Sequence, residues 1–494
     1  RNSLDESVPL LTATGAVLRL PSSAANAVQL AENSIRSLLM TLRRYVLTAC
    51  LSLLSAAAFP VLANPFEHKL ANGLRVIVKE DRRAPTAAHM VWYRAGSMDE
   101  SNGTTGVAHV LEHMMFKGTP KVGPGEFNRL VAAAGGRDNA FTSRDYTAYF
   151  QQVPADRLEE MMALEADRMR HLTLSAKEFE QEIRVVMEER RLRTDDQPQA
   201  LLFEAMNAVA FKAHPYRRPI IGWMDDLENM TAQDARDWYE RWYVPNNAYV
   251  VIVGDVDHKA VFRAAEKYYG GLKSRPLPLR KPQDEPVQTG VRRVVVKAPA
   301  ELPVVIMGYR APVVRDVEKD LDPYALDMLG AVLSGHGAAR FSKHLVREQR
   351  LAVSAGAEYD STARGPGMFY LIGMPSEGKS VTEMEAGLRA ELARVQADGV
   401  SAEELNRAKA QLVAGQIYKL DSMFAQAMEI GQLEAVGLPY TSGERIIERL
   451  KAVTAEQVQD VARRYFSDDT LTVGILEPQP MSSAPRRSFA TPRH

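Results

Sequence analysis

Three ionisable side chains, His109, Glu112 and His113, lie within five consecutive residues of the sequence. If this segment is helical, histidines four positions apart lie one above the other on one helix face. Two imidazoles in that arrangement can bind one zinc ion through their ring nitrogens. Glu112 directly precedes the second histidine and could hold a metal-bound water and accept its proton. The order H-x-x-E-H is a signature of zinc peptidases, so the spacing predicts that chemistry here.

The same histidines could instead be ordinary residues packed on a helix. Their neighbours are apolar, and a glutamate in such surroundings is costly without a partner. A metal ion accounts for three ionisable groups in one apolar turn better than packing does. The apolar neighbours are Ala108, Val110, Leu111, Met114, Met115 and Phe116.

A peptidase zinc ion needs a third protein ligand and one open position for water. A capping box that begins at Ser175 predicts a helix over 175–194, which carries Glu182, Glu188 and Glu189. Glu182 and Glu189 are seven residues apart and share one helix face, which could offer a metal ligand and a supporting carboxylate. The spacing fits equally well an exposed acidic face paired with neighbouring arginines. Those arginines are Arg184, Arg190, Arg191 and Arg193.

The motif resembles that of the pitrilysin or insulinase family of inverzincin peptidases, which includes the mitochondrial processing peptidase. The match is His109-Val-Leu-Glu112-His113 followed, 76 positions after His113, by Glu189 in the segment Val-Val-Met-Glu-Glu-Arg. The resemblance implies that His109, His113 and Glu189 bind one zinc ion per chain. It also implies that Glu112 is the catalytic base and that Glu182 is the supporting carboxylate of the catalytic centre.

Two further segments carry the resemblance. The segment from Gly135 through Asn139-Ala140-Phe141-Thr142 resembles the family's edge strand, which implies that Asn139, Ala140 and Phe141 contact extended substrate. The alternative is that this segment is the end of a core strand with no role in binding. The second half of the chain resembles the family's inactive partner domain, where an Arg and a Tyr reach the substrate. Arg347 fits the Arg, whereas Val353 stands where the Tyr is common.

The resemblance extends over almost all of residues 64–494 and implies two homologous α+β domains, each an α/β sandwich of the LuxS and processing-peptidase type, that form a clamshell. It implies a zinc metalloendopeptidase that acts on unfolded peptides or short polypeptide segments. The expected assembly is a homodimer or a heterodimer with an inactive homologous chain. Two alternatives stay open: a non-catalytic structural or assembly subunit of this fold, and a catalytic subunit that needs an inactive partner chain.

The patterns along the chain predict the same layout. A proline-rich, polar segment at 276–290 indicates a linker between domains at 64–275 and 291–478. Strands followed by runs of helices in each half indicate two α+β domains. Val91–Ala95 resembles Met307–Ala311, and the helix-then-strand pattern at 231–254 recurs at 454–476, which predicts an internal duplication. The predicted strands are 74–79, 87–95, 249–253, 292–297, 304–310 and 471–476.

Composition narrows the class of protein. Apolar residues make up 46% of the chain and charged residues 25%, which is ordinary for globular domains. The net charge is −1, from 61 basic and 62 acidic side chains. Nucleic-acid-binding domains usually carry a strong basic excess, so no nucleic-acid partner is expected.

Residues 40–63 have the pattern of a secretory signal. A basic segment, Thr41–Arg44, precedes an apolar run that ends at Val61-Leu62-Ala63, where a signal peptidase could cleave. We expect translation to begin at Met40, residues 1–39 to be an upstream extension, and the mature protein to be periplasmic or secreted with no membrane span. The alternative is a transmembrane anchor, against which Pro60 and the cleavage-like end argue.

The single cysteine bears on the metal ligands. Cys50 ends a segment that resembles a lipoprotein box, but the apolar stretch before it is only about five residues, shorter than a signal core, so we do not expect tethering there. Cleavage after Ala63 would leave no cysteine, so any metal must be bound by His, Asp or Glu. The tail at 479–494, rich in Pro, Ser and Arg, is expected to be disordered.

Overall fold

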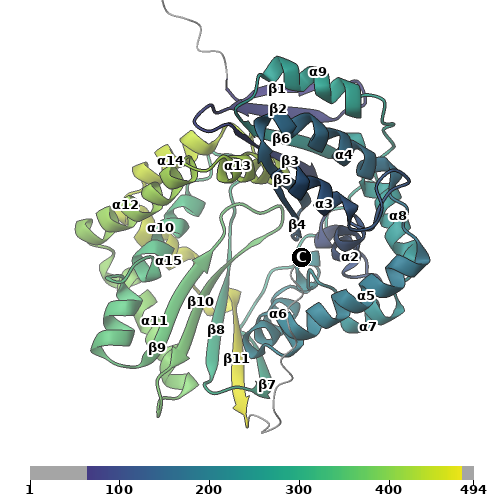
Figure 1. The fold of residues 1–494 in the computed structure, drawn as a ribbon. Helices are drawn as coiled ribbons and strands as arrows, with labels where there is room; N and C mark the ends of the chain where they lie inside the picture. Colours follow the sequence, from purple (N-terminus) through teal and green to yellow (C-terminus); the bar gives the residue numbers. More distant parts are fainter. Residues whose placement is uncertain (1–63, 481–494) are drawn as a thin grey trace, which may run out of the picture. The chain divides into compact units, whose positions relative to one another are not determined.

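The computed structural model describes residues 64–480, which contain two β-sheets flanked by helices (Figure 1). The proposed extension at 1–39, the signal segment at 40–63 with Cys50, and the tail beyond residue 480 lie outside the described residues. Within residues 64–480, no helix is both long enough and apolar enough to cross a membrane.

The two sheets share one topology. The first sheet has the order β1-β2-β6-β3-β5-β4 and the second β7-β11-β8-β10-β9. In both, one pair is parallel (β2 with β6, β7 with β11) and the pairs that follow are antiparallel. This correspondence confirms the predicted duplication and the α+β class. The strands are β1 (Phe66–Lys69), β2 (Arg75–Glu80), β3 (Thr86–Tyr93), β4 (Arg137–Thr142), β5 (Thr147–Pro154), β6 (Ala248–Gly254), β7 (Arg292–Pro299), β8 (Val304–Ala311), β9 (Ala352–Tyr359), β10 (Gly367–Pro375) and β11 (Leu471–Gln479).

Helices of the first half cover one face of the first sheet. Side chains alternate between the two faces of a strand, so Val91 and Tyr93 of β3 enter the core under these helices, whereas Met90 and Trp92 face the other way. The helices of this half are α2 (Val107–Met114), α3 (Glu126–Ala133), α4 (Leu158–His171), α5 (Ala176–Arg190), α6 (Pro198–Ala210), α7 (Met224–Asn229), α8 (Ala232–Trp242) and α9 (His258–Tyr269).

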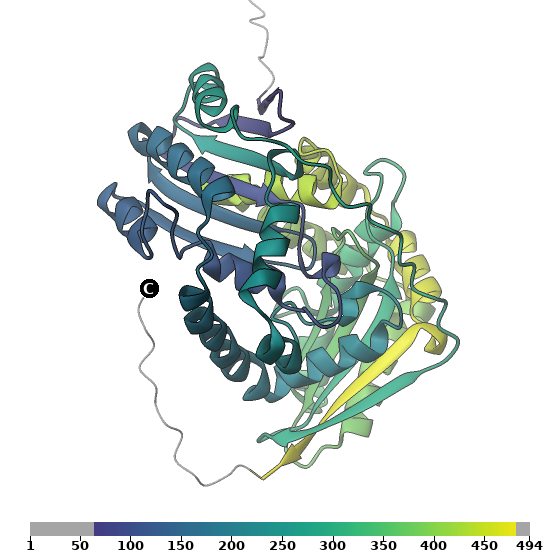
Figure 2. The same cartoon turned by 90° about the vertical axis from the view of Figure 1, so that its right-hand side faces the viewer.

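The opposite face of each sheet is covered by a helix from the other half of the sequence (Figures 1 and 2). Ala427 and Ile430 of α13 (Met423–Val436) pack on the first sheet beside Trp92. Leu202 and Met206 of α6 pack on the second sheet. The two stretches predicted at 64–275 and 291–478 therefore exchange one covering helix each, because each sheet has a second apolar face to bury.

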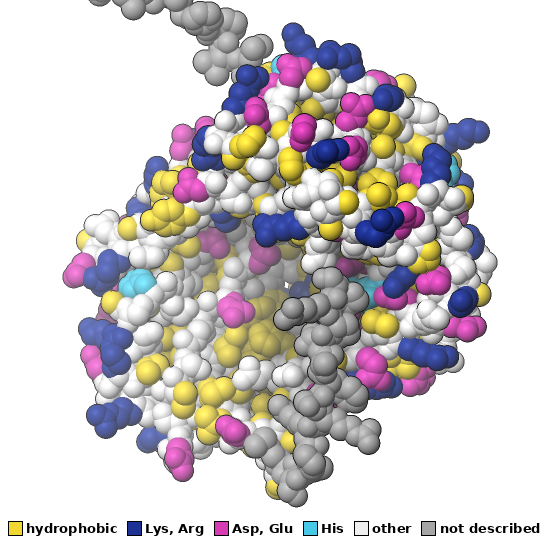
Figure 3. All heavy atoms as spheres, in the orientation of Figure 1, with side chains coloured by type: hydrophobic (Ala, Val, Ile, Leu, Met, Phe, Trp, Pro, Cys, Tyr) yellow, Lys and Arg dark blue, Asp and Glu magenta, His cyan; other side chains and the backbone are white. Residues whose placement is uncertain are grey.

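The other face of the second sheet is covered by the remaining helices, as the predicted duplication requires. These are α10 (Asp322–Ser334), α11 (Val381–Asp398), α12 (Ala402–Lys419), α14 (Gly443–Ala452) and α15 (Ala455–Tyr465). The linker at 276–290 contains no helix or strand. Acidic and basic side chains are interspersed over the face in Figure 3, in keeping with the near-zero net charge.

Candidate metal centre

Helix α2 is fixed at both its beginning and its buried face. It begins after Gly106, whose φ of 88° is readily adopted only by glycine. The buried carboxylate of Glu100 accepts hydrogen bonds from the backbone N–H groups of Gly106 and Ala108, both at 2.9 Å, which satisfies two donors at the start of the helix. Val110 and Leu111 are fully buried, so the face that carries His109 and His113 is held in one orientation.

The structure brings together the three predicted metal ligands from α2 and α5. One ligand atom from each of His109, His113 and Glu189 lies within 4.8 Å of the others. Glu189 Oε2 lies 3.3 Å from His113 Nε2 and 3.8 Å from His109 Nε2. Ligands at about 2.0–2.1 Å from a tetrahedral zinc ion are separated by about 3.3 Å, so the spacing fits zinc after a small movement. Two imidazoles and one carboxylate are also a ligand set of catalytic zinc sites.

Glu182 lies where a supporting carboxylate is needed. Its Oε1 is 2.9 Å from His113 Nδ1, on the edge of the ring opposite Glu189. A carboxylate at Nδ1 holds the proton on that nitrogen and leaves Nε2 free to bind a metal. Glu182 is 7% exposed, whereas Glu188 points outward and pairs with Arg191. Helix α5 thus has both predicted faces: Glu182 and Glu189 turn toward the histidines, and Glu188 belongs to the acidic face paired with arginine.

The protonation of the two histidines differs. Burial and the neighbouring His113 lower the pKa of His109 to about 4, so its ring is neutral near pH 7. Burial also disfavours charge on His113, but its hydrogen bonds with Glu182 and Glu189 outweigh burial and raise its pKa to about 9. The two glutamates therefore stabilise positive charge at His113, the place where a metal cation would bind.

Glu112 precedes His113 on α2 but does not belong to the cluster of His109, His113 and Glu189. The hydroxyl of Thr142, at the end of β4, donates a hydrogen bond to Glu112 Oε2 at 2.5 Å. Burial raises the pKa of Glu112, which makes the carboxylate a better proton acceptor, while the hydrogen bond from Thr142 opposes the rise. The role of Thr142 was not predicted, since only its position in the strand motif was recognised.

The segment that resembles a substrate-binding strand is an edge strand. β4 pairs with β5 on one side and has no strand on the other among the described residues. Asn139 is exposed, and Ala140 packs toward α2. Phe141 points to the opposite face of the sheet, where its ring lies 5.7 Å from that of Trp92. The Phe141 side chain therefore lies on the face of the sheet opposite that of Ala140 and α2.

Among the described residues, Arg347 makes no contact with His109, His113 or Glu189. It lies on a π-helical segment, Phe341–Glu348, and donates a hydrogen bond to the carbonyl of Gly337 at 2.5 Å. Val353 lies on β9, the edge strand of the second sheet, with its side chain 52% exposed.

Two other features are separate from this centre. A second group of possible ligand atoms comes from Glu80, Asp257 and His258. Asp257 caps α9 and Glu80 accepts hydrogen bonds from His258, so the start of the helix accounts for this group.

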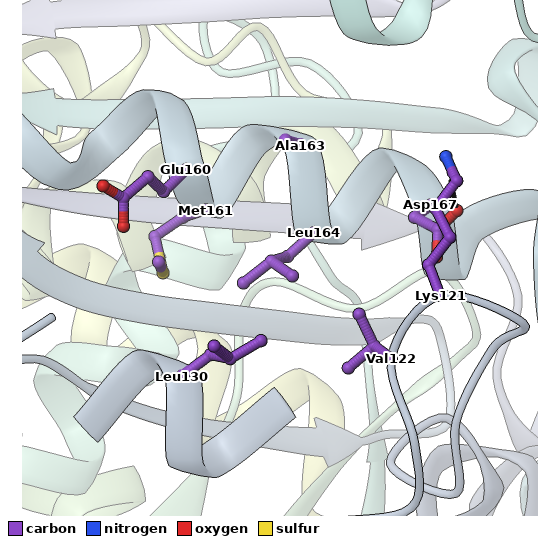
Figure 4. Close-up of a pocket in the computed structure, with 8 residues that line it drawn as sticks. All are labelled: Lys121, Val122, Leu130, Glu160, Met161, Ala163, Leu164 and Asp167. Atoms are coloured by element: carbon purple, nitrogen blue, oxygen red, sulfur yellow. Dashed lines mark ion pairs between the residues drawn. The ribbon is translucent and has the colours of Figure 1, made fainter. Parts of the chain in front are cut away.

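An apolar groove of about 350 Å³ lies between α3 and α4 and contains no residue of the metal cluster (Figure 4). It is lined by Lys121, Val122, Leu130, Glu160, Met161, Ala163, Leu164 and Asp167.

Comparisons with known proteins identify the family of this chain. Residues 75–223 match the insulinase family, peptidase family M16, and residues 229–412 match the peptidase M16 inactive domain. The match to the inactive domain therefore includes α8 and β6, which lie in the first half of the chain, and β6 belongs to the first sheet.

Relatives from two bacteria match nearly the whole described chain. The zinc protease PqqE of Helicobacter pylori is 32% identical over 419 residues, which are 83% of this chain and 92% of that protein. The crystal structure of a protease from Helicobacter pylori has a TM-score of 0.79 at 30% identity and covers 84% of this chain and 99% of its own. A peptidase M16 inactive domain from Pseudomonas fluorescens shares the fold, with a TM-score of 0.76 at 17% identity over 85% of this chain and all of its own. The chain belongs to the insulinase family of peptidases, family M16.

Proposed function

We propose that this protein is a zinc metalloendopeptidase whose metal is held by His109, His113 and Glu189. The observation that carries the proposal is the convergence of two imidazole nitrogens and one carboxylate oxygen within 4.8 Å, beside the carboxylate of Glu112. The curated relatives named as zinc proteases support the same metal and the same class of reaction.

The residues of this chain have distinct roles in the proposed reaction. Zinc bound here would lower the pKa of a water molecule and polarise the scissile carbonyl. Glu112 accepts a proton from the attacking water and passes it to the leaving amine. Thr142 holds one oxygen of Glu112, which leaves the other free for that proton. Glu182 fixes the ring of His113.

The free edge of β4 gives the proposed substrate class. An extended peptide can add to this edge through main-chain hydrogen bonds, which bind many sequences in one conformation. We therefore propose unfolded peptides or short polypeptide segments as substrates, with Asn139 and Ala140 beside them. The signal pattern at 40–63 supports a periplasmic or secreted location.

A second candidate is a peptidase that needs an inactive homologous chain. Val353 stands where the family's partner domain commonly has a tyrosine, and Arg347 has no contact with the metal cluster among the described residues. A second chain, either a homologue or another copy, would then supply the missing substrate contacts. A non-catalytic subunit would need none of His109, Glu112, His113 and Glu189, so their joint presence disfavours that role.

The test is metal content and peptidase activity on one preparation, compared between wild type and Glu112→Gln. We expect one zinc ion per chain in both proteins, with cleavage of a fluorogenic peptide by wild type alone. Zinc-bound but inactive wild type that gains activity with a co-purified chain would favour the second candidate. Wild type that binds no zinc would overturn the proposed function.

A further inference from the structure

Two carboxylates of the metal centre are each shared between the ring of His113 and a cationic side chain. Glu182 directs Oε1 to His113 Nδ1 at 2.9 Å and Oε2 to the Lys117 ammonium at 2.5 Å. Glu189 directs Oε2 to His113 Nε2 at 3.3 Å and Oε1 to the Arg193 guanidinium at 2.6 Å. Each carboxylate therefore has one oxygen on the ring of His113 and the other on a cation.

We infer that Lys117 and Arg193 are positioning residues that orient the metal-binding carboxylate and its supporting partner. The inference rests on the proposed function and names two residues outside the H-x-x-E-H motif and its distant glutamate. Neither cation touches a histidine ring in the described contacts, so each acts through the glutamate that it holds.

The physical basis is the rotation of a carboxylate about the bond that holds it to its side chain. Without a second partner, the carboxylate of Glu182 can turn its plane away from His113. Charge-assisted hydrogen bonds are about twice as strong as neutral ones, so a cation on one oxygen holds the plane in which the other oxygen meets the ring. The same argument applies to Glu189, where Arg193 leaves only Oε2 on the side of the two histidines.

The path of the backbone after α2 and after α5 explains how the two cations reach the glutamates. Lys117 lies four residues after His113, and its N–H bonds to the carbonyl of Met114 as the chain turns at the end of α2. Arg193 lies four residues after Glu189 within the π-helical segment Arg191–Asp195 that continues α5. A π-helical turn is wider than an α-helical one and is frequent at functional sites, and here it returns a long side chain to the ligand.

The different exposure of Lys117 and Arg193 predicts that their loss weakens zinc binding unequally. The Lys117 side chain is 28% exposed and the side chain of its partner Glu182 is 10% exposed, whereas the Arg193 side chain is 76% exposed. Exposed ion pairs contribute little because water screens them, while a shielded pair fixes its partner more firmly. Loss of an outer partner that touches a metal ligand, as Glu182 does, typically weakens metal binding about 10- to 100-fold. Lys117 acts through Glu182, one contact further out, so we expect Lys117→Met to weaken zinc binding about 10-fold, at the lower end of that range, and Arg193→Met about threefold.

The experiment measures the zinc affinity of the full chain by competition with a chelating dye, for wild type, Lys117→Met, Lys117→Arg, Arg193→Met and Arg191→Met. Arg191 is the matched control because it pairs with Glu188 on the outward face of the same segment. We expect Lys117→Arg to restore most of the affinity and Arg191→Met to match wild type. At saturating zinc, kcat of Lys117→Met should fall with KM unchanged, since the proposed role of the lysine is to hold Glu182 and not to bind the peptide.

Wild-type zinc affinity in both Lys117→Met and Arg193→Met would overturn the inference while leaving the proposed function intact. Equal weakening by Arg191→Met would also overturn it, because the effect would then be one of surface charge. If Lys117→Met does not fold, the test is Arg193→Met, because the exposed arginine is not needed for the core. Weaker zinc binding that Arg193→Lys restores supports the inference, and unchanged zinc binding overturns it. Absence of zinc from wild type would instead reject the proposed function itself.

Discussion

Gly106 and Gly222 meet backbone to backbone at the start of α2, and neither has room for a side chain. A Cβ on Gly222 would lie 2.3 Å from the carbonyl oxygen of Thr105 and 2.8 Å from Gly106 Cα, and a Cβ on Gly106 would lie 2.5 Å from the carbonyl oxygen of Ile221. Arg190, which follows Glu189, donates a hydrogen bond to the carbonyl of Gly222 at 2.8 Å. The crossing therefore ties the start of the helix that bears the histidines to the end of the helix that bears Glu189.

Substitution of Gly222 by alanine should damage both stability and the metal centre. The φ of 88° is strained for alanine, which costs about 1 kcal/mol, and the clash with rigid backbone adds about 1–3 kcal/mol. We expect a free energy of unfolding lower by about 2–4 kcal/mol and weaker zinc binding, because α2 must shift. Urea denaturation of the metal-free protein and dye competition for zinc measure the two effects.

Gly103 provides the matched control. Its φ is 91°, but a Cβ there would meet nothing within 4 Å, so Gly103→Ala isolates the backbone strain. It should lose only about 1 kcal/mol and keep wild-type zinc affinity. Equal effects of the two substitutions would show that the crossing does not position the ligands.

The ion pair of Arg190 with Glu204 should be a major local contribution to stability. The two terminal nitrogens of the guanidinium donate to the carboxylate, at 2.8 and 2.9 Å, and the Arg190 side chain is 6% exposed. Removal of one partner from such a buried pair leaves an uncompensated charge and costs about 3–5 kcal/mol. Arg190→Met should therefore lower the free energy of unfolding by that amount in urea denaturation.

The double variant Arg190→Met with Glu204→Met separates the pair from the packing of its side chains. It should lose less stability than Arg190→Met alone, because no charge is left buried without a partner. Losses that simply add would contradict a coupled pair.

Thr142 should affect turnover without affecting the metal. Thr142→Val keeps the shape of the side chain and removes the hydroxyl that donates to Glu112. A hydrogen bond to a charged group is worth about 1.5–3 kcal/mol, so kcat should fall about 10- to 100-fold if Glu112 loses its orientation. Zinc content should stay at the wild-type value, and Thr142→Ser should keep most of the activity. A valine variant with wild-type kcat would show that the hydroxyl has no part in catalysis.

The two proposed histidine ligands could be predicted from the sequence because their spacing is a local property of one helix. His109 and His113 share a face of α2 by helical geometry alone, whereas the choice of Glu189 required the family resemblance. The spacing on α5 fitted a metal-binding face and an exposed acidic face equally well because the helix carries both. Glu189 lies on the side of the histidines and Glu188 on the outward side.

Two of the elements that the patterns missed, α6 and α13, take their environment from the other half of the chain. α13 has buried residues on all sides, including Gly431, where a Cβ would lie 2.1 Å from Trp92, so it shows no single apolar stripe. α6 likewise packs on the sheet of the other half. Lys117 was missed as a partner of Glu182 because an ion pair between separate helices leaves no regular spacing in the sequence. Arg193, four residues after Glu189, was included only among the arginines that could pair with an exposed acidic face.

His214 should make stability depend on pH below neutrality. Burial and the nearby Arg310, Arg144 and Arg315 lower its pKa from 6.5 to about 4, against the opposing effect of Glu285. Its Nδ1 also accepts the N–H of Tyr216 at 3.2 Å, which requires that nitrogen to be unprotonated. Between these two pKa values the unfolded chain binds a proton that the folded chain does not, so stability is full above pH 6.5 and falls as the pH falls toward 4.

The measurement compares wild type with His214→Asn, whose side-chain oxygen can still accept the N–H of Tyr216 but does not titrate. Between pH 7 and pH 5, wild type should lose about 2 kcal/mol more of its free energy of unfolding than the variant, since about 1.5 pH units of the window are crossed at about 1.4 kcal/mol each. Urea midpoints at the two pH values give the difference. If wild type and variant lose the same amount, the acid sensitivity belongs to other groups and His214 is not buried in its neutral form.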